Sequence, residues 1–417
     1  MAAEPITGTV RESPSTHEVH LVHLEPPIAS GFADELARRI YFVDERILGF
    51  ELIVRDSEVT AVRLRTDPDQ DVAQLAAKLL RAVAQEVEAQ LPAKNIRRWT
   101  SARDADDQVR PAFNDLVSAG FALSTGPGQV AVAGPVLALM DRLDALIARV
   151  ATTKFGATEY RYPTLVPTTA LASSGYLTSF PHHVMFTSRL PADLDGYRAY
   201  IEDVEHGADP GRSALARCVD GSHCLPPTMC YHTFQQLRAT TLAAPTLAVT
   251  ARGKSFRYES RYATGMERLW DFTIRETVLF GSGQHVHAEL DQFLETVTAL
   301  FDALGLAGYC ELATDAFFAG PESAVSASSQ RLLQLKFEVR LTVAPGRTIA
   351  VGSFNLHGTH FGTTFEIGLP CGDITHSACT GFGLERLAYA VLCQFGLSEN
   401  DWPEALRPGA GQWEGTL

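Results

Sequence analysis

The segment from Leu333 to Leu341 most constrains the fold of this chain, because apolar and polar residues alternate strictly along it. Successive side chains of a β-strand point to opposite faces, so the pattern predicts a strand with one apolar and one polar face. The polar positions are Gln334, Lys336, Glu338 and Arg340. Two interpretations stay open: this face is simply solvated, or it belongs to an antiparallel sheet and lines a polar active site.

The composition indicates a globular protein with a large core and an excess of acidic residues. Of 417 residues, 46% are hydrophobic and 20% are charged, which excludes a disordered or fibrous chain. This length suggests two or three domains. Lys and Arg total 35 against 49 Asp and Glu, a formal net charge of -14 that disfavours tRNA or DNA as the main partner.

Two parts of unequal size are predicted, joined by a polar segment. Residues 1–92 read as a small α+β domain, 93–110 as a linker without periodicity, and 111–417 as a larger domain of amphipathic helices and two-faced strands. In the small domain we expect strands at 19–23, 51–55 and 59–66, a helix at 33–42, and a longer helix from Val72 to Leu91 that ends at Pro92. In the larger domain we expect a helix from Pro135 to Val150 and a strand at 158–162.

Targeting signals are not evident in the sequence. The N-terminus is polar and acidic, and no stretch reaches the roughly 18 apolar residues that a membrane span needs. Seven cysteines, an odd number without CxxC spacing, are typical of reduced thiols. These features predict a cytoplasmic protein with no membrane partner.

Two neighbouring segments carry the first candidate site. The segment 254–259 reads as a strand with Arg257 and Glu259 on one face, and the chain returns over 268–276 with Arg268, Phe272 and Glu276 on one face. A guanidinium can bind a phosphate through two hydrogen bonds, and an aromatic ring can stack on a base. Taken alone, a hairpin with cross-strand ion pairs is the simpler interpretation.

A glycine-rich turn supplies the second candidate. Gly381 and Gly383 precede Glu385 and Arg386 in a GxGxER sequence that opens a helix. Glycines permit close approach of a ligand to the backbone, and Arg386 falls in the first turn of the helix.

Taken in order, these sequences resemble the second and third signature motifs of class II aminoacyl-tRNA synthetases. The FRxE sequence ends at Glu259, RxxxF runs from Arg268 to Phe272, and GxGxER ends at Arg386. The resemblance covers roughly 111–417. It implies an antiparallel sheet of six or seven strands flanked by helices, usually in a homodimer, that activates an amino acid as its adenylate.

The resemblance also implies a role for each motif residue in binding ATP. Arg257 would contact the α-phosphate and Arg268 the ATP tail, while Phe272 and Arg386 would stack on the two sides of adenine. Arg257, Glu259 and Arg386 form the implied catalytic set. Adenylation agrees with such a site, because it needs cationic stabilisation of a crowded phosphorus rather than a protein nucleophile.

Longer phrases are similar to the amino acid:carrier protein ligases, truncated relatives of the methanogen-type seryl-tRNA synthetase. These phrases are LPPTMCYHTF, ERLWDFTIRE, SFNLHGTHFG and SACTGFGLERL. The resemblance implies a catalytic Zn²⁺ held by Cys230, Glu276 and Cys379, with a fourth position for the amino group of a small amino acid such as glycine or alanine.

Other residues receive weaker assignments from the same resemblance. Asp315 lies where the family places an acidic residue near the amino group, although a turn aspartate is an equal alternative. Asn355 is a candidate contact to the amino acid, and Glu338 to ATP or Mg²⁺. Where many seryl enzymes carry a metal-binding glutamate this chain has Ile349 or Ala350, so the Mg²⁺ ligands stay open.

The remaining cysteines and two histidines are expected to be mainly structural. Cys224 and Cys371 are alternatives to the predicted zinc ligands, although neither matches the family position. His357 and His360 form an HxxH pair for which we expect pocket or core positions rather than metal binding. Three further cysteines are also expected to be structural: Cys218, Cys310 and Cys393.

The acceptor of the aminoacyl group is the remaining question. Because the N-terminal part is short, acidic and without heptads, we expect a phosphopantetheine-bearing carrier protein and no tRNA. Carrier proteins are acidic, so docking is expected to need a basic patch, drawn from Lys94, Arg97 and Arg98. The alternatives are an atypical seryl-type tRNA synthetase and a non-catalytic paralogue.

Overall fold

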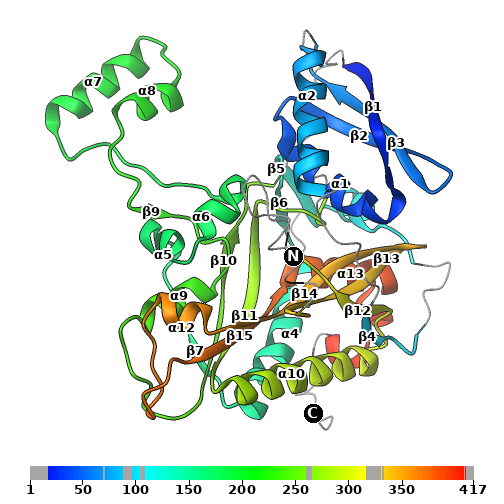
Figure 1. The fold of residues 1–417 in the computed structure, drawn as a ribbon, viewed down its shortest axis with the longest axis vertical. Helices are drawn as coiled ribbons and strands as arrows, with labels where there is room; N and C mark the ends of the chain where they lie inside the picture. The colour runs from blue at the N-terminus through cyan, green and yellow to red at the C-terminus, as the bar shows by residue number, and fades with distance from the viewer. Residues whose placement is uncertain are drawn as a thin grey trace, which may run out of the picture.

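The computed structural model describes residues 17–68, 71–87, 96–103, 109–259, 265–315, 330, 333–407 and 409. Within them the chain forms an N-terminal α+β domain, a larger domain built on a central sheet, and an arm of two helices that projects away from that domain (Figure 1).

The N-terminal domain packs two helices on a three-stranded antiparallel sheet of order β1-β3-β2. Leu36, Ile40, Leu75 and Leu79 from the helices meet Val62 and its neighbours from the sheet in a separate core. Its elements are β1 (Glu18–Ala29), α1 (Ala33–Val43), β2 (Ile47–Arg55), β3 (Glu58–Thr66) and α2 (Val72–Ala82), which continues as a π-helical turn over Val83–Val87. The end of the predicted helix at Leu91 lies outside the described residues.

An eight-stranded sheet organises the larger domain in the described residues. Its order is β4-β12-β13-β14-β15-β11-β10-β7, and every neighbouring pair is antiparallel except β10 and β7. The strands are β4 (Arg97–Thr100), β12 (Gly308–Leu312), β13 (Lys336–Ala344), β14 (Arg347–Gly358), β15 (His376–Gly383), β11 (Asp271–Gly281), β10 (Leu247–Phe256) and β7 (Thr158–Tyr160).

The two faces of this sheet have different coverings. Three helices, α4 (Pro135–Arg149), α10 (Gly283–Ala303) and α13 (Leu384–Phe395), pack on one face, where Phe337, Val339 and Phe382 of the sheet lie in the main core. On the other face Val278 and Phe280 pack with shorter helices in a second core, and polar side chains occupy the rest. The candidate site lies on this second face.

The remaining elements are short and connect or cover the sheets. They are α3 (Phe113–Ser118), β5 (Ala122–Gly126), β6 (Gln129–Val132), β8 (Val166–Pro167), α5 (Thr168–Ser173), α6 (Tyr176–Ser179), the 3-10 turn η4 (Pro181–His183), α7 (Leu194–Glu205), α8 (Pro210–Arg217), β9 (His223–Cys224), α9 (Cys230–Gln236) and α12 (His360–Thr364). Helices α7 and α8 form the projecting arm (Figure 1).

The structure corrects several predicted boundaries. Part of the predicted linker 93–110 is strand β4, because Trp99 and its neighbours pair with β12 at the edge of the sheet. Strand β13 begins at Lys336, and Leu333 lies outside it with 67% exposure. The strand predicted at 158–162 ends at Tyr160.

The hairpin around Arg257 and Arg268 has other bounds than predicted. Strand β10 ends at Phe256 and β11 starts at Asp271, so Arg257 and Arg268 both lie outside the strands. The sheet has eight strands and one parallel pair, rather than six or seven antiparallel strands. None of the described helices combines the length and the apolar character that crossing a membrane requires.

Candidate active site

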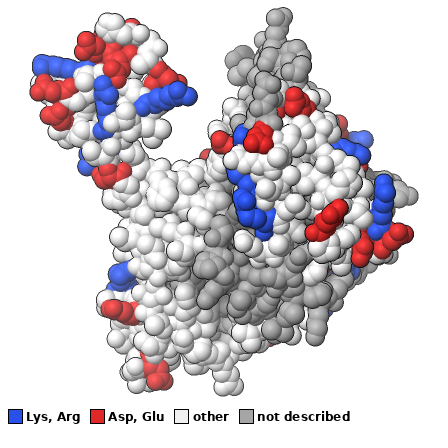
Figure 2. All heavy atoms as spheres, turned by 45° about the horizontal axis from the view of Figure 1, so that its top comes forward, with Lys and Arg blue, Asp and Glu red and all other residues white. Residues whose placement is uncertain are grey.

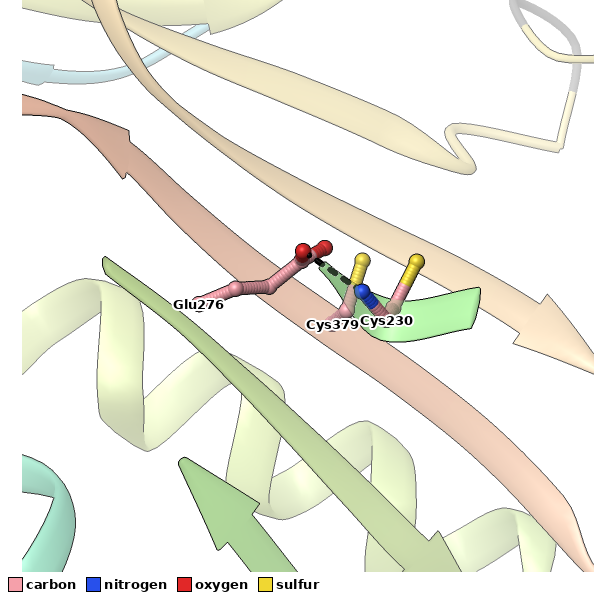
Figure 3. A group of neighbouring side chains, drawn as sticks. All are labelled: Cys230, Glu276 and Cys379. Atoms are coloured by element: carbon pink, nitrogen blue, oxygen red, sulfur yellow. Dashed lines mark hydrogen bonds between the residues drawn. The ribbon is translucent and has the colours of Figure 1, made fainter. Parts of the chain in front are cut away.

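Three potential metal ligands meet on the second face of the sheet. Cys230 is the first residue of α9, Glu276 lies on β11, and Cys379 lies on the neighbouring strand β15. All three are buried, and their ligand atoms lie within 4.8 Å of one another. Figure 3 shows the two sulfur atoms and the carboxylate gathered together. The pairing of β11 with β15, in which Val278 faces Cys379, brings together two ligands that are about a hundred residues apart in sequence.

Hydrogen bonds from neighbouring groups orient Glu276 and Cys379. The Glu276 Oε2 atom accepts from Thr228 Oγ1 at 2.6 Å and from the backbone N–H of Cys230 at 2.8 Å. Asn355 Nδ2 lies 3.6 Å from Cys379 Sγ. The hydrogen bond between the two thiols, burial and the Glu276 charge all raise the pKa of Cys230. Two thiols and a carboxylate buried together could hold a metal ion, because a divalent cation would offset the charge that such a cluster develops.

The alternative cysteines do not reach this triad. Cys224 donates to Val166 O at 3.7 Å in the short β8–β9 pair, and Cys371 is exposed beside Asp373. Of the remaining cysteines, Cys310 and Cys393 are buried, whereas Cys218 is half-buried. Among the residues that the structure describes, the Cys230–Glu276–Cys379 group is the one cluster of three or more such ligands.

A cluster of guanidinium groups lies near the triad. The guanidinium of Arg257 stacks 5.5 Å from the ring centre of Phe272, and its Nε donates to Pro227 O at 3.0 Å. Arg268 donates to Glu259 Oε2 at 2.6 Å. Although burial alone would raise the pKa of Glu259, the cations around it lower that pKa to about 2. The side chains of the FRxE and RxxxF sequences therefore lie together even though Arg257 and Arg268 are outside the strands.

Arg386 completes this cluster from the first turn of α13. Its Nη1 donates to Ala350 O at 3.2 Å. Burial and the nearby charges of Arg268 and Arg257 lower the pKa of Arg386 to about 10, against the opposing charge of Glu259. Guanidinium groups that repel one another in a buried place are suited to binding a polyanion. A Cβ on Gly383, which immediately precedes this helix, would meet nothing within 4 Å, so space is open beside the backbone.

The charged face of β13 lines the same side of the sheet. Lys336 faces Asn355 of β14, which in turn faces Cys379 of β15, so the register places these residues in one row. Lys336 is only 8% exposed and pairs with Asp315 and, at 3.2 Å, with Glu338. Burial would raise the pKa of Asp315, but the Lys336 charge and hydrogen bonds lower it. Of the two interpretations left open for this face, the structure favours the polar site.

Two residues of this region were not predicted as site residues. In the sequence Lys336 is one of several charges on an alternating strand. Its partner Asp315 comes from another segment, so its role was not visible there. Glu385 is buried in the GxGxER turn and accepts from both the N–H and the Oγ1 of Thr273, each at 2.8 Å. Glu385 thereby joins α13 to β11. Its position beside Arg386 is the sequence feature that could have identified it as a residue of this region.

The two histidines of the HxxH pair bond to different parts of the larger domain and do not share a ligand. His357 Nδ1 lies 3.0 Å from Ser377 Oγ, whereas His360 Nε2 lies 3.1 Å from Ser174 O. Burial lowers the pKa of His357 to about 3, so this side chain is neutral at physiological pH.

Comparison with solved structures identifies the class of fold. The seryl-tRNA synthetase of M. kandleri, in a complex with A. aeolicus tRNASec, matches with a TM-score of 0.66 at 20% identity, covering 85% of this chain and 72% of that one. The seryl-tRNA synthetase of Pyrococcus horikoshii complexed with ATP matches with a TM-score of 0.55 at 14% identity, covering 81% and 77%. The protein therefore has the class II seryl-tRNA synthetase fold.

Sequence comparison narrows the family. The chain is 30% identical to "Amino acid--[acyl-carrier-protein] ligase 2" of Bradyrhizobium diazoefficiens over 311 residues, which cover 72% of this chain and 89% of that protein. It is 25% identical over 295 residues to the type-2 serine--tRNA ligase of Methanococcus aeolicus, covering 69% of this chain but only 56% of that protein. No family model matches the sequence. The chain belongs to the amino acid--[acyl-carrier-protein] ligases, as the sequence motifs predicted.

Proposed function

We propose that this protein activates a small amino acid, glycine or alanine, with ATP and transfers it to the phosphopantetheine thiol of a carrier protein. The observation that carries this proposal is the convergence of Arg257, Arg268 and Arg386 beside a Cys–Glu–Cys triad on one face of a class II sheet. A triphosphate would neutralise the guanidinium cluster, and the triad and its neighbours would receive the amino acid.

The first step is an in-line displacement at phosphorus. A carboxylate oxygen of the amino acid attacks the α-phosphorus of ATP, and the bond to the bridging oxygen breaks so that pyrophosphate leaves. Arg257 would stabilise the charge on the α-phosphate and Arg268 would hold the departing phosphates. Phe272 and Arg386 would enclose the adenine, and Glu259 would orient Arg268 through their ion pair.

The second step transfers the aminoacyl group. The thiol sulfur attacks the carbonyl carbon of the adenylate, AMP leaves, and the thiol proton passes to solvent.

Asp315 and Asn355 would contact the amino acid, while Glu338 is the candidate contact to ATP or its Mg²⁺. At the metal-binding position of the seryl enzymes, Ile349 and Ala350 offer no side-chain ligand, so backbone atoms and ATP itself would hold most of the Mg²⁺ shell.

Zinc is the metal that the triad fits best. Cys230, Glu276 and Cys379 would hold it, because two thiolates and a carboxylate suit Zn²⁺ and leave a fourth position open. When bound, the metal would supply a Lewis-acid site for the amino group of the amino acid. The hydrogen bonds from Thr228 and Cys230 N would keep the Glu276 carboxylate in place.

The choice of acceptor rests on charge and family. On the face shown in Figure 2 the described Lys and Arg side chains are interspersed with Asp and Glu, including on the α7–α8 arm, and form no continuous basic surface for tRNA. The predicted docking patch is partly engaged, since Arg97 stacks on Tyr309 and Arg98 donates to Asp291 at 2.6 Å, while Lys94 lies outside the described residues. A cytoplasmic homodimer is part of this proposal.

A second candidate, a seryl-type tRNA synthetase, follows from the serine--tRNA ligase relatives. Pyrophosphate exchange with a panel of amino acids tests activation, and mass spectrometry of apo and holo carrier proteins tests transfer. We expect exchange with glycine or alanine and an aminoacyl mass shift on the holo carrier alone. Charging of total tRNA without labelling of holo carrier would favour the second candidate. Absence of all exchange in zinc-replete protein would indicate a non-catalytic paralogue.

A further inference from the structure

Helix α1 of the N-terminal domain is buried on two sides. Leu36 and Ile40 point into the core of their own domain. Glu35 and Arg39, four residues apart and therefore on one face, are only 6% and 1% exposed and form an ion pair. Charged side chains are rarely buried so completely, and here Thr314 of the larger domain contacts Glu35. The N-terminal domain is thus docked on the larger domain through a charged helix face.

The first contact of this face reaches the residue next to Asp315. Thr314 Oγ1 donates to Glu35 Oε1 at 3.2 Å, and both residues are buried. Asp315 follows Thr314 directly and pairs with Lys336 of β13. Thr314 and Asp315 are therefore held from one side by α1 and from the other by the central sheet.

The second contact reaches the turn η4. The ring of Phe42, on α1, lies 4.4 Å from the ring of His182 and 5.9 Å from that of His183, measured between centroids. The carbonyl of His183 accepts from the backbone N–H of Tyr258 at 3.0 Å. Tyr258 stands between Arg257 and Glu259 in the chain, so this turn supports the backbone that carries the guanidinium cluster.

We propose that α1 is a positioning element of the site, which sets the affinity for the amino acid by holding residues 313–315 and 181–183 against the sheet. Glu35 acts through Thr314 on Asp315, and Phe42 acts through the two histidines. This inference rests on the proposed function, because it takes the amino acid as the ligand of Asp315. It assigns the N-terminal domain a part in the active site of its own chain.

A matched pair of substitutions at Thr314 tests the first contact. Thr314→Val keeps the shape but removes the hydroxyl, whereas Thr314→Ser keeps the hydroxyl. In pyrophosphate exchange, Thr314→Val should raise KM for the amino acid about tenfold, as expected for one lost buried hydrogen bond, with KM for ATP unchanged. Thr314→Ser should stay near the wild type, and so should Arg63→Gln, which removes an exposed ion pair of the N-terminal domain. An amino-acid KM within twofold of the wild type in Thr314→Val overturns the inference.

Hydrogen exchange provides a measurement that does not need activity. Backbone amides of residues 313–315 should exchange faster in Thr314→Val, and those of His182 and His183 faster in Phe42→Leu, while the amides of β15 keep the wild-type rate. Wild-type protein without any pyrophosphate exchange would refute the proposed function, and the amide rates would then decide the positioning separately. Unchanged rates in both variants would refute the positioning role even in an active enzyme.

Discussion

The two ends of the site are held in place by different kinds of structure. At the strand-held end, the triad of Cys230, Glu276 and Cys379 stands on β11, β15 and the start of α9. At the loop-held end, Asp315 lies just after β12 and His183 in the short turn η4, and α1 contacts Thr314 and His183 from a separate domain. Hydrogen bonds between the neighbouring strands β11 and β15 fix the positions of Glu276 and Cys379. The loop-held end depends instead on side chains that meet across two domains.

The largest expected effect is at the strand-held end. Cys379→Ser or Glu276→Gln should remove the metal and lower the rate of pyrophosphate exchange by about 10³-fold, since a Lewis acid supplies several kcal/mol to such a site. Metal analysis of the wild type should give about one zinc per chain. The exposed Cys371→Ser variant is the control and should keep both metal and activity. Full zinc retention in the two triad variants would refute the assignment of these residues as zinc ligands.

A smaller loss of activity is expected for a substitution in the guanidinium cluster. This cluster adjoins the strand-held end, because Arg386 lies on α13 directly after β15. Arg386→Ala should lower kcat of activation by about 10²-fold, the range for removing one preorganised cationic or hydrogen-bonding group. Zinc content should not change, because Arg386 contacts none of the three ligands in the described structure. Exposed Arg347, which pairs with Glu267, provides the matched control Arg347→Ala. Equal losses in both variants would contradict a specific role for Arg386.

The loop-held end should respond more modestly to loss of its ion pair. Lys336→Met leaves the Asp315 carboxylate without its strongest partner and should raise KM for the amino acid about tenfold, because one charge-assisted hydrogen bond is lost. The double variant Lys336→Met/Asp315→Asn should recover thermal stability relative to the single variant, since the Asp315 charge is gone and Glu338 keeps its partner Arg340. A single variant with the wild-type melting temperature and KM would show that the pair positions nothing.

The smallest expected effect is a pH dependence of the loop-held end. Burial lowers the pKa of His182 to about 4 and of His183 to about 3, from about 6.5. A histidine whose folded pKa is depressed contributes stability that is complete above about pH 6.5 and is lost as the pH falls toward 4. The urea midpoint should therefore decrease between pH 7 and pH 5, and less so in His182→Gln. Identical pH slopes in the two proteins would exclude this histidine as the source.

Much of the strand-held end could be predicted from the sequence. The FRxE and GxGxER sequences contain their own turn and strand signals, and the three residues predicted as metal ligands lie together in the structure. These motifs are short and local, so the residue types that they require are visible without the fold. The predicted bounds of the hairpin were wrong because Arg257 and Arg268 lie in irregular backbone, which no periodicity marks.

The loop-held end could be predicted only in part. Asp315 was a candidate, but Lys336 gained its role from pairing with a residue of another segment, and Glu35 contacts Thr314 across 279 positions. Strand β4 was assigned to a linker because an edge strand of four residues carries too little alternation to be distinguished from a polar loop. Such contacts depend on how the domains dock.

The sequence by itself determined the acidic globular character, the class of fold and the residue types of the chemistry, because alternation and motifs are properties of neighbouring residues. Only the tertiary structure decided that the charged face of β13 joins the row with Asn355 and Cys379, since strand register brings together residues far apart in the chain. It also decided that α1 lies against Thr314 and the turn η4. That contact buries a charged helix face, and burial is a property of the whole fold.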